Sequence, residues 1–217
     1  MILIPAYNSA KHLPELISRI DSSAPEIDIL IVNDGSTDNS TAILDSLHVK
    51  YIDIECNRGK GYALQKGYEY AINNSYDYVL TFDSDLQHLP EEIPLFLDRV
   101  GSADLVIGVR DISSRKMPYH RKLSNRLTTF VISFFSTKKF RDSQSGFRMI
   151  STELQKRLNL KSVKYDYESE QLFEIGKLDF RLLEIPITTV YTDSESHISH
   201  FMDTLRFIKL TLHRIFS

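Results

Sequence analysis

Short apolar runs alternate with segments of helical periodicity through the first half of the chain. Each run is strand-like, and the segment after it repeats apolar residues every three or four positions. The expected strands are Ile2–Ala6, Ile27–Val32, Val49–Ile54, Tyr78–Phe82 and Asp104–Val109. The expected helices are Lys11–Ile20, Ser40–Leu47, Gly61–Ile72 and one that begins at Pro90. This alternation predicts an α/β fold, a mostly parallel sheet flanked by helices, with ligands at the carboxyl ends of the strands.

The second half of the chain has a different pattern. Tyr119–Ser136 is expected to be a helix with apolar residues on one side and basic residues on the other. Gly146–Ile150 and Arg181–Tyr191 are expected strands, and Pro186 places the latter at a sheet edge. Ile198–Phe216 has the spacing of an amphipathic terminal helix. Nothing marks a second domain, so we expect a single one.

Composition and charge exclude several classes of protein. Cys56 is the only cysteine among the 217 residues, which excludes a disulfide framework. No apolar run approaches the roughly 18 residues of a membrane span, and no secretory signal precedes the first strand. The net charge is −3, yet residues 115–141 hold eight Lys or Arg and no acid. We therefore expect a cytoplasmic protein with a local anionic partner and no general affinity for nucleic acid.

Two polar clusters follow the first two expected strands. Pro5 ends the first strand, and Tyr7 beside it could stack on a flat base or simply belong to a turn. Asp34 follows the second strand, where its carboxylate could accept hydrogen bonds from a base or ribose. Gly35 permits a sharp turn after it. For Ser36–Asp38 we favour capping of the next helix over ligand binding.

The third cluster, Asn57–Gly61, is a turn in which two glycines flank Lys60 just before a helix. Free backbone N–H groups and a cation facing the same space favour a phosphate group. The spacing matches neither GxxxxGK[ST] nor GxGxxG, which excludes the phosphate-loop and dinucleotide-binding motifs.

The fourth cluster carries the strongest signal. If the segment after Tyr78–Phe82 is extended, Asp83, Asp85 and Gln87 point the same way. Two carboxylates and an amide oxygen are hard ligands that suit Mg²⁺ or Mn²⁺ shared with substrate phosphates. The alternative is an ordinary acidic turn, which the neighbouring Gly-Lys-Gly turn makes less attractive.

Six motifs in register resemble the family 2 glycosyltransferases of the GT-A fold, and within them the dolichyl- and polyprenyl-phosphate mannosyl/glucosyltransferase branch. They cover roughly positions 1–170. The motifs are IPAYN (4–8), VNDGSTD (32–38), NRGKGYAL (57–64), DSDLQH (83–88), DSQSGFR (142–148) and YDYESE (165–170). The late SHISHFMDTLR (196–206) also resembles the ending of that branch. The resemblance implies a single GT-A domain over residues 1–217, with 1–110 on the nucleotide-sugar side, 111–195 on the acceptor side and 196–217 as the terminal helix.

The resemblance implies a donor site at these motifs. The metal ligands it implies are Asp83, Asp85 and Gln87, holding Mg²⁺ or Mn²⁺ on the diphosphate. The nucleotide-sugar residues it implies are Pro5, Ala6, Tyr7, Val32, Asp34, Lys60, Asp83, Ser84, Asp85 and Gln87. Such a metal stabilises the charge that develops on the departing nucleoside diphosphate. Three departures stand out, since Ser9 replaces a usual Glu, Asn33 replaces a common Asp and His197 replaces a frequent Lys.

The acceptor side is implied in the same way. Arg110, Arg121 and Ser124 resemble the residues that bind an acceptor phosphate in that branch. Asp142 either orients such an arginine, contacts the sugar or acts as a base. The segment 165–170 lies, in the family, near the donor sugar, and the alternative for its acids is a solvated helix face. The basic helix over 119–136 could lie on a membrane interface or simply pack on the sheet.

The leading hypothesis is an inverting, metal-dependent transfer of mannose or glucose from a GDP- or UDP-linked sugar to a polyprenyl or dolichyl phosphate, with Asp83, Asp85, Asp142, Arg110 and Arg121 as the catalytic set. An acceptor phosphate ionised near pH 7 needs cations more than a base. The first alternative is transfer to a saccharide hydroxyl with Asp142 as base. The second is an inactive nucleotide-binding or membrane-surface scaffold. Peripheral contact with the cytoplasmic membrane face is expected, and the oligomeric state stays open.

Overall fold

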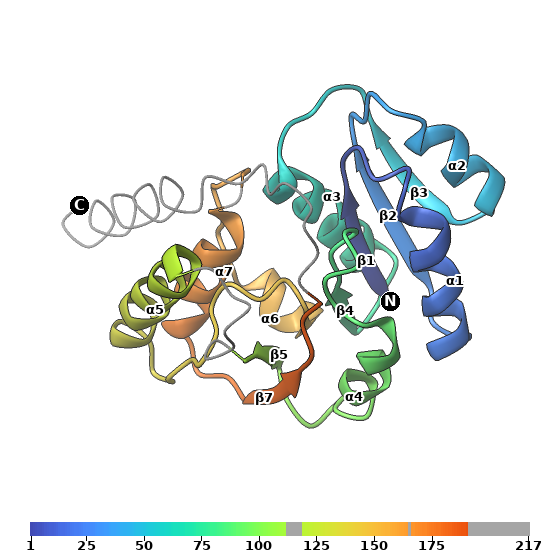
Figure 1. Ribbon diagram of the computed structural model, residues 1–217. Helices are drawn as coiled ribbons and strands as arrows, with labels where there is room; N and C mark the ends of the chain where they lie inside the picture. Colours follow the sequence, from blue (N-terminus) through green and yellow to red (C-terminus); the bar gives the residue numbers. More distant parts are fainter. Residues whose placement is uncertain (112–118, 165, 191–217) are drawn as a thin grey trace.

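A computed structural model describes residues 1–111, 119–164 and 166–190, apart from the side chains of His120 and Arg121. Seven strands of this part form one sheet in the order β3-β2-β1-β4-β6-β5-β7 (Figure 1). The strands are β1 Ile2–Ala6, β2 Ile29–Asp34, β3 Lys50–Ile54, β4 Tyr78–Thr81, β5 Leu105–Arg110, β6 Arg148–Ser151 and β7 Leu182–Ile187. The helices are α1 Leu13–Ser23, α2 Ser40–Leu47, α3 Lys60–Asn73, α4 Ile93–Leu97, α5 Tyr119–Phe134, α6 Thr152–Lys156 and α7 Tyr167–Gly176, with a 3₁₀ turn at Pro90–Glu92.

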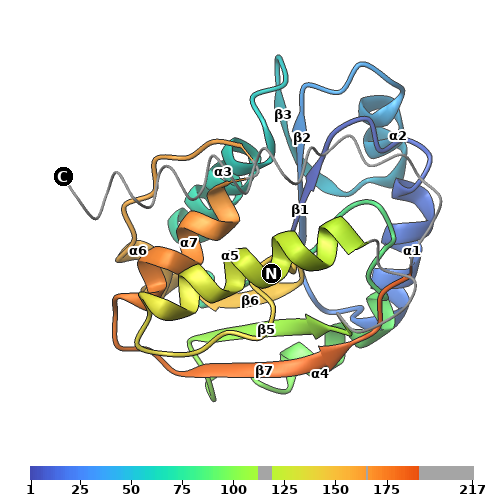
Figure 2. The ribbon, with the colours of Figure 1, turned by 60° about the vertical axis from the view of Figure 1, so that its left-hand side comes forward.

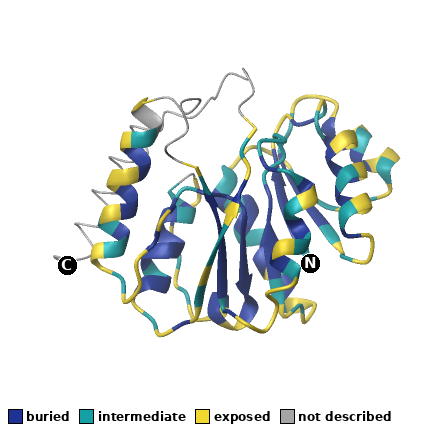
Figure 3. Ribbon diagram, turned by 60° about the horizontal axis from the view of Figure 1, so that its bottom comes forward, coloured by how far each residue is buried: buried dark blue, intermediate teal, exposed yellow. Residues whose placement is uncertain are grey.

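The sheet separates two hydrophobic cores. Along β1, Ile2 and Ile4 face α1, α2 and α4, whereas Leu3 between them faces the opposite side. That opposite side is covered by α3, α5, α6 and α7, with α5 running across the face of the sheet in Figure 2. The five inner strands, from β2 to β5 in the sheet order, are therefore buried on both faces, as Figure 3 shows in dark blue, whereas the edge strands β3 and β7 are more exposed. Burial on both sides explains why the first strands read as continuous apolar runs.

The sheet is mostly parallel, as the alternation of strands and helices predicts. β1 pairs in parallel with β2 and β4, and β5 pairs in parallel with β7. The exception is β6, which lies antiparallel between β4 and β5. Because β5 thereby runs in the same direction as β4, the carboxyl ends of β1, β2, β4 and β5 lie along one edge of the sheet. The loops that carry most of the expected site residues start there.

The expected elements are confirmed with small shifts of their ends. Strand β7 is an edge strand, as Pro186 predicts, but it ends at Ile187 rather than Tyr191. The helices α6 and α7 were not expected from the sequence. The expected terminal helix Ile198–Phe216 lies outside the described residues.

Candidate active site

Hydrogen bonds between side chains and backbone tie together the loops at the carboxyl edge. Asn8 Oδ1 accepts a hydrogen bond from the backbone N–H of Thr37 at 2.8 Å, which joins the loops after β1 and β2. Ser9 Oγ lies 2.8 Å from Ser84 Oγ, which joins the loop after β1 to the loop after β4. The residues expected at the donor site from three separate motifs therefore share one edge. Ser9, the departure from the family pattern, is part of this connection.

Asp34 holds the Gly-Lys-Gly turn in place. Its Oδ1 accepts a hydrogen bond from the Arg58 N–H at 2.9 Å, and its Oδ2 accepts one from the Gly59 N–H at 2.7 Å. Gly35 has a φ of 65°, and a Cβ there would collide with the backbone of Cys56. Asp34 is buried, so each oxygen has only its remaining lone pair for a ligand. Its contact with a base or ribose stays a prediction.

The other residues expected around the base differ in exposure. The ring of Tyr7 is 47% exposed and is available for stacking. The side chain of Val32 is buried in the core, so only its main chain can meet a ligand. Pro5 and Ala6 are likewise buried at the end of β1. Of the Ser36–Asp38 segment, Asp38 does accept the N–H of Ser40 at 3.0 Å, next to the start of α2.

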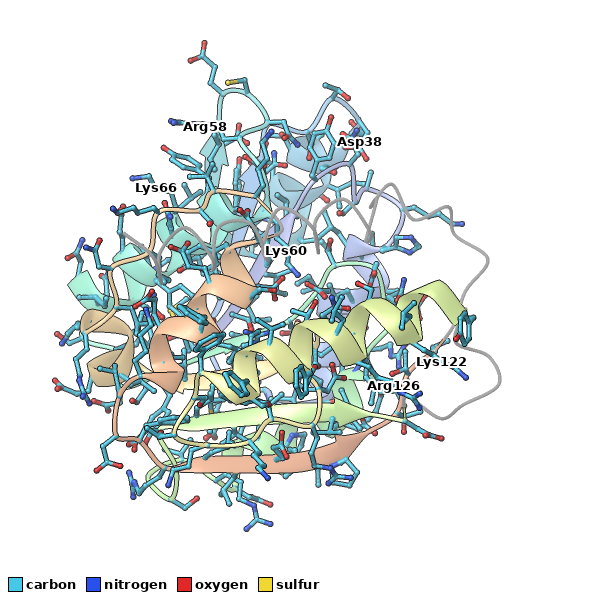
Figure 4. The ribbon with its side chains drawn as sticks, turned by 90° about the vertical axis from the view of Figure 1, so that its left-hand side faces the viewer. Asp38, Arg58, Lys60, Lys66, Lys122 and Arg126 are labelled. Carbon is cyan, nitrogen blue, oxygen red and sulfur yellow. The ribbon has the colours of Figure 1, made fainter. Side chains whose placement is uncertain are left out.

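Lys60 lies at the start of α3 and points to the middle of the edge (Figure 4). Its Nζ is 2.7 Å from Asp83 Oδ1 and 2.8 Å from Glu168 Oε2. Burial alone would lower the pKa of Lys60, but the two carboxylates outweigh burial and raise it above its ordinary value. Lys60 is therefore a permanent cation that joins α3, the end of β4 and α7.

The segment that carries Asp83, Asp85 and Gln87 is a turn, so the expectation of an extended chain is wrong. Leu86 has a φ of 58°, in the left-handed region, and Asp85 Oδ1 accepts the N–H of Gln87 at 3.0 Å. An aspartate that bonds the backbone two residues on favours such a turn over an extended strand.

The two aspartates have opposite electrostatic environments. Burial raises the pKa of Asp83, but the nearby Lys60 ammonium outweighs it, and the pKa lies below its ordinary value. For Asp85, burial and the charge of Asp83 raise the pKa above its ordinary value. A carboxylate whose charged form is disfavoured in this way gains from a bound cation.

The oxygen donors fit a divalent cation that is shared with a substrate. Mg²⁺ is ordinarily held by one or two carboxylates together with substrate phosphates. Asp83 and Asp85 are two carboxylates within one turn, and Gln87 adds an amide oxygen. Within the described ranges, no three His, Cys, Asp or Glu side chains gather closely enough to form a complete protein cage. The donor set thus suits a cation that completes its coordination with diphosphate oxygens and water.

The buried Asp142 pairs with Arg110, a half-buried residue at the carboxyl end of β5. Arg110 Nε and Nη2 donate to the two oxygens of Asp142 at 2.7 and 2.9 Å, and Asn125 Nδ2 donates to Asp142 Oδ1 at 2.7 Å. Asp142 has no exposed surface. Burial raises its pKa, but the charge of Arg110 and these hydrogen bonds outweigh it and lower the pKa. Of the roles expected for Asp142, this geometry suits orientation of an arginine.

Ser124 joins the same network through Gln144. Gln144 donates its backbone N–H to Asp142 Oδ1 at 3.1 Å and its side-chain amide to Ser124 Oγ at 3.2 Å. Arg110, Asp142 and Ser124 are therefore brought together, whereas the side chain of Arg121 is not described. Sequence reasoning did not single out Asn125 or Gln144. The DSQSGFR motif contains Gln144 and could have indicated it.

Three further charged or titratable residues are largely shielded from solvent. His88 is buried against Phe82 and Phe147, and burial lowers its pKa to about 4. Glu168 bonds Lys60 instead of forming a solvated helix face. Arg148 is buried and donates to the backbone oxygens of Ser145 and Glu168. Hydropathy patterns do not predict buried charges.

Comparisons with known proteins identify the family of the chain and its fold. The family described as Glycosyl transferase family 2 matches residues 1–158. The polyprenol monophosphomannose synthase of Mycolicibacterium smegmatis is 27% identical, over 92% of this chain and 79% of its own length. The UDP-N-acetylglucosamine–dolichyl-phosphate N-acetylglucosaminyltransferase of Methanococcus voltae is 30% identical, over 88% of this chain and 86% of its own.

Among solved structures, the glucosyl-3-phosphoglycerate synthase of Mycobacterium tuberculosis, in complex with Mn²⁺, uridine diphosphate and glucosyl-3-phosphoglycerate, has a TM-score of 0.74 at 19% identity. The alignment covers 98% of this chain and 78% of that one, which shows that the fold is shared. The chain belongs to glycosyltransferase family 2, and its fold is the GT-A fold. It is a glycosyltransferase.

Proposed function

We propose that the protein transfers a hexose, mannose or glucose, from a GDP- or UDP-linked sugar to a polyprenyl or dolichyl phosphate with inversion at the sugar. The observation that carries this proposal is that Asp142 is fully engaged in holding Arg110 at the site edge. The site thus offers a fixed cation for an anionic acceptor. It offers no free base at that position.

The donor half is supported by the Gly-Lys-Gly turn and the carboxylates beside it. Lys60 supplies a cation beside these carboxylates, which favours a diphosphate. Of the backbone N–H groups around the start of α3, those of Arg58 and Gly59 are held by Asp34 and that of Tyr62 by Val163 O. When Mg²⁺ or Mn²⁺ is bound, it stabilises the negative charge on the leaving diphosphate as a Lewis acid. Asp83, Asp85 and Gln87 are the residues that would hold it. The exposure of the Tyr7 ring at the same edge supports stacking on the base.

The reaction balances without a general base. An oxygen of the acceptor phosphate attacks C1 of the hexose, and the bond from C1 to the diphosphate oxygen breaks. The nucleoside diphosphate leaves with the bonding electrons. The second pKa of a phosphate monoester is about 6, so this nucleophile is already ionised near pH 7. Arg110, fixed by Asp142, positions the phosphate, and Ser124 lies in the same network. Transfer to a saccharide hydroxyl would need a base, and Asp142 is poorly suited to that role.

The outer face of α5 supports an acceptor that is a lipid. Phe130 and Phe134 are 66% and 71% exposed, and they continue a stripe of exposed apolar residues. Lys122 and Arg126 extend from the same helix (Figure 4). Apolar and cationic side chains on one helix favour contact with an anionic lipid surface. Within the part of the chain that the structure describes, none of the helices has the length and apolarity to span a bilayer. The apolar and cationic face of α5 supports our proposal of peripheral contact at the cytoplasmic face of the membrane.

A product assay tests this function. Purified protein is incubated with Mn²⁺, GDP- or UDP-linked mannose or glucose, and either a polyprenyl phosphate or a soluble oligosaccharide. We expect a glycosylated lipid phosphate with one of these donors and no product with Asp83→Asn. Glycosylation of the oligosaccharide alone would support the saccharide alternative. No product with any donor or acceptor would leave the scaffold hypothesis as the better account.

A further inference from the structure

Two carboxylates from different elements hold the Lys60 ammonium. One is Asp83, which follows β4, and the other is Glu168, in the first turn of α7. All three side chains are largely shielded from solvent, with exposed fractions of 19% for Lys60, 27% for Asp83 and 17% for Glu168. These two ion pairs are therefore held more firmly than an exposed salt bridge, which contributes little to stability.

The chain before α7 fixes this geometry. Val163 O accepts the N–H of Tyr62 at 2.9 Å, so the segment lies directly against the Gly-Lys-Gly turn. A Cβ at Gly59 would lie 2.8 Å from Val163 O, and one at Gly61 would lie 2.6 Å from Lys164 O. The buried carboxylate of Glu170 accepts the N–H of Ser162 at 2.7 Å and anchors the segment. We call residues 161–164 the brace.

The same contacts place the positive charge of Lys60 beside Asp83, which is an expected metal ligand. The Lys60 ammonium group lies 2.7 Å from Asp83 Oδ1, so it would strongly repel a divalent cation bound to that carboxylate. A diphosphate changes this balance, because it adds negative charge and offers Lys60 a second set of oxygen partners. The metal and the nucleotide are then coupled through one side chain.

We propose that Lys60 competes with a divalent cation for Asp83 until a nucleoside diphosphate draws Lys60 away. Glu168 is the positioning residue that, with the brace, keeps Lys60 beside both partners. The metal and the nucleotide therefore bind together, and the metal alone binds weakly. This inference rests on the proposed donor site, but it concerns the order in which that site is filled.

Calorimetric titration of Mn²⁺ tests it, with and without saturating UDP or GDP. We expect the nucleotide to strengthen Mn²⁺ binding to the wild type by well over tenfold. Lys60→Met should bind Mn²⁺ alone about tenfold more tightly than the wild type and should lose most of the coupling to nucleotide, because a coupling of 5–150-fold is typical of linked sites. Lys66→Met, which removes an exposed lysine paired with Glu69 on the same helix, is the matched control and should bind as the wild type does.

Glu168→Gln separates this effect from a loosened fold. Without the Glu168 carboxylate, Lys60 pairs with Asp83 alone and competes more strongly for it. This variant should therefore bind Mn²⁺ alone several-fold more weakly than the wild type does. A structural defect would weaken binding in both variants, whereas the proposal requires opposite directions. Lys60→Met that binds Mn²⁺ alone no more tightly than the wild type overturns the inference. Failure of the wild type to bind UDP or GDP in the presence of Mn²⁺ would instead overturn the proposed function.

Discussion

At the scale of single residues, the fully buried Asp142 decides between two chemistries. Both of its oxygens accept hydrogen bonds from Arg110. Removing one partner of a buried ion pair costs about 3–5 kcal/mol, because the other charge is left uncompensated. We expect Asp142→Asn to lower the free energy of unfolding by about 3 kcal/mol and to raise KM for the lipid phosphate. Chemical denaturation and acceptor titrations measure the two effects.

The control for this variant is Asp104→Asn, which breaks the exposed pair with Arg181. An exposed pair contributes about 0–1 kcal/mol, so this change should be nearly neutral. An Asp142→Asn protein with unchanged stability and unchanged KM, but with a lost acidic limb in its pH–rate profile, would contradict orientation and favour base catalysis.

The lowered pKa of Asp142 also predicts how stability depends on pH. The ordinary pKa of an unfolded aspartate is about 3.9, and the folded value lies below it. The stabilisation by the ionised group is therefore complete above about pH 5 and is lost as the pH falls through the folded pKa. The difference in unfolding free energy between wild type and Asp142→Asn should shrink on acidification from pH 6 to pH 2. A difference in unfolding free energy that grows as the pH falls would show that folding raises, and does not lower, the pKa of Asp142.

At the scale of elements, the close contact between α3 and the brace depends on a glycine. A Cβ at Gly61 would lie 2.6 Å from both Lys164 O and Tyr167 Cβ. Overpacking of this kind costs about 1–3 kcal/mol, so Gly61→Ala should lower the melting temperature and weaken binding of the donor nucleotide. Gly101→Asn is the control, since Gly101 has open space around it and asparagine tolerates its φ of 78°. Equal melting temperatures for the two variants would argue against the close contact.

The exposed apolar face of α5 is the element that we expect to contact a lipid surface. Replacing Phe130 and Phe134 together by serine should reduce sedimentation with anionic liposomes at least several-fold, because the apolar side chains supply the buried area. Binding of the nucleotide in solution should not change. Leu95→Ser, at an exposed apolar position on α4, is the matched control. Liposome binding that survives the double substitution would place membrane contact elsewhere.

At the scale of the whole molecule, the alternating apolar runs were sufficient to predict the parallel sheet and the edge at which the loops meet. They could not predict α7, because that helix buries Glu170 and Gln171 together with its apolar residues and so lacks a clear amphipathic stripe. The turn at Leu86 was missed because local hydrogen bonding by Asp85 overrides the extended reading.

The topology of the sheet also explains why only part of the site could be predicted. Residues at or just beyond the carboxyl ends of buried strands, such as Asp34 and Asp83, are placed by the topology of the sheet. Partners that arrive from distant segments are not, and Glu168 meets Lys60 only because α7 packs beside α3. Pairing of this kind is a property of the folded chain and leaves no periodic signal in the sequence.

The central claim is that this edge binds a nucleoside diphosphate together with a divalent cation. A thermal-shift panel of UDP, GDP, CDP and dTDP, each with and without Mn²⁺, tests it most directly. A ligand at 100 times its Kd stabilises the fold by about 2.7 kcal/mol, which gives a rise of several degrees for a chain of this size. We predict that one nucleotide raises the melting temperature strongly, and only with Mn²⁺ present. No shift with any of the four, or shifts that are the same without the metal, would contradict the claim.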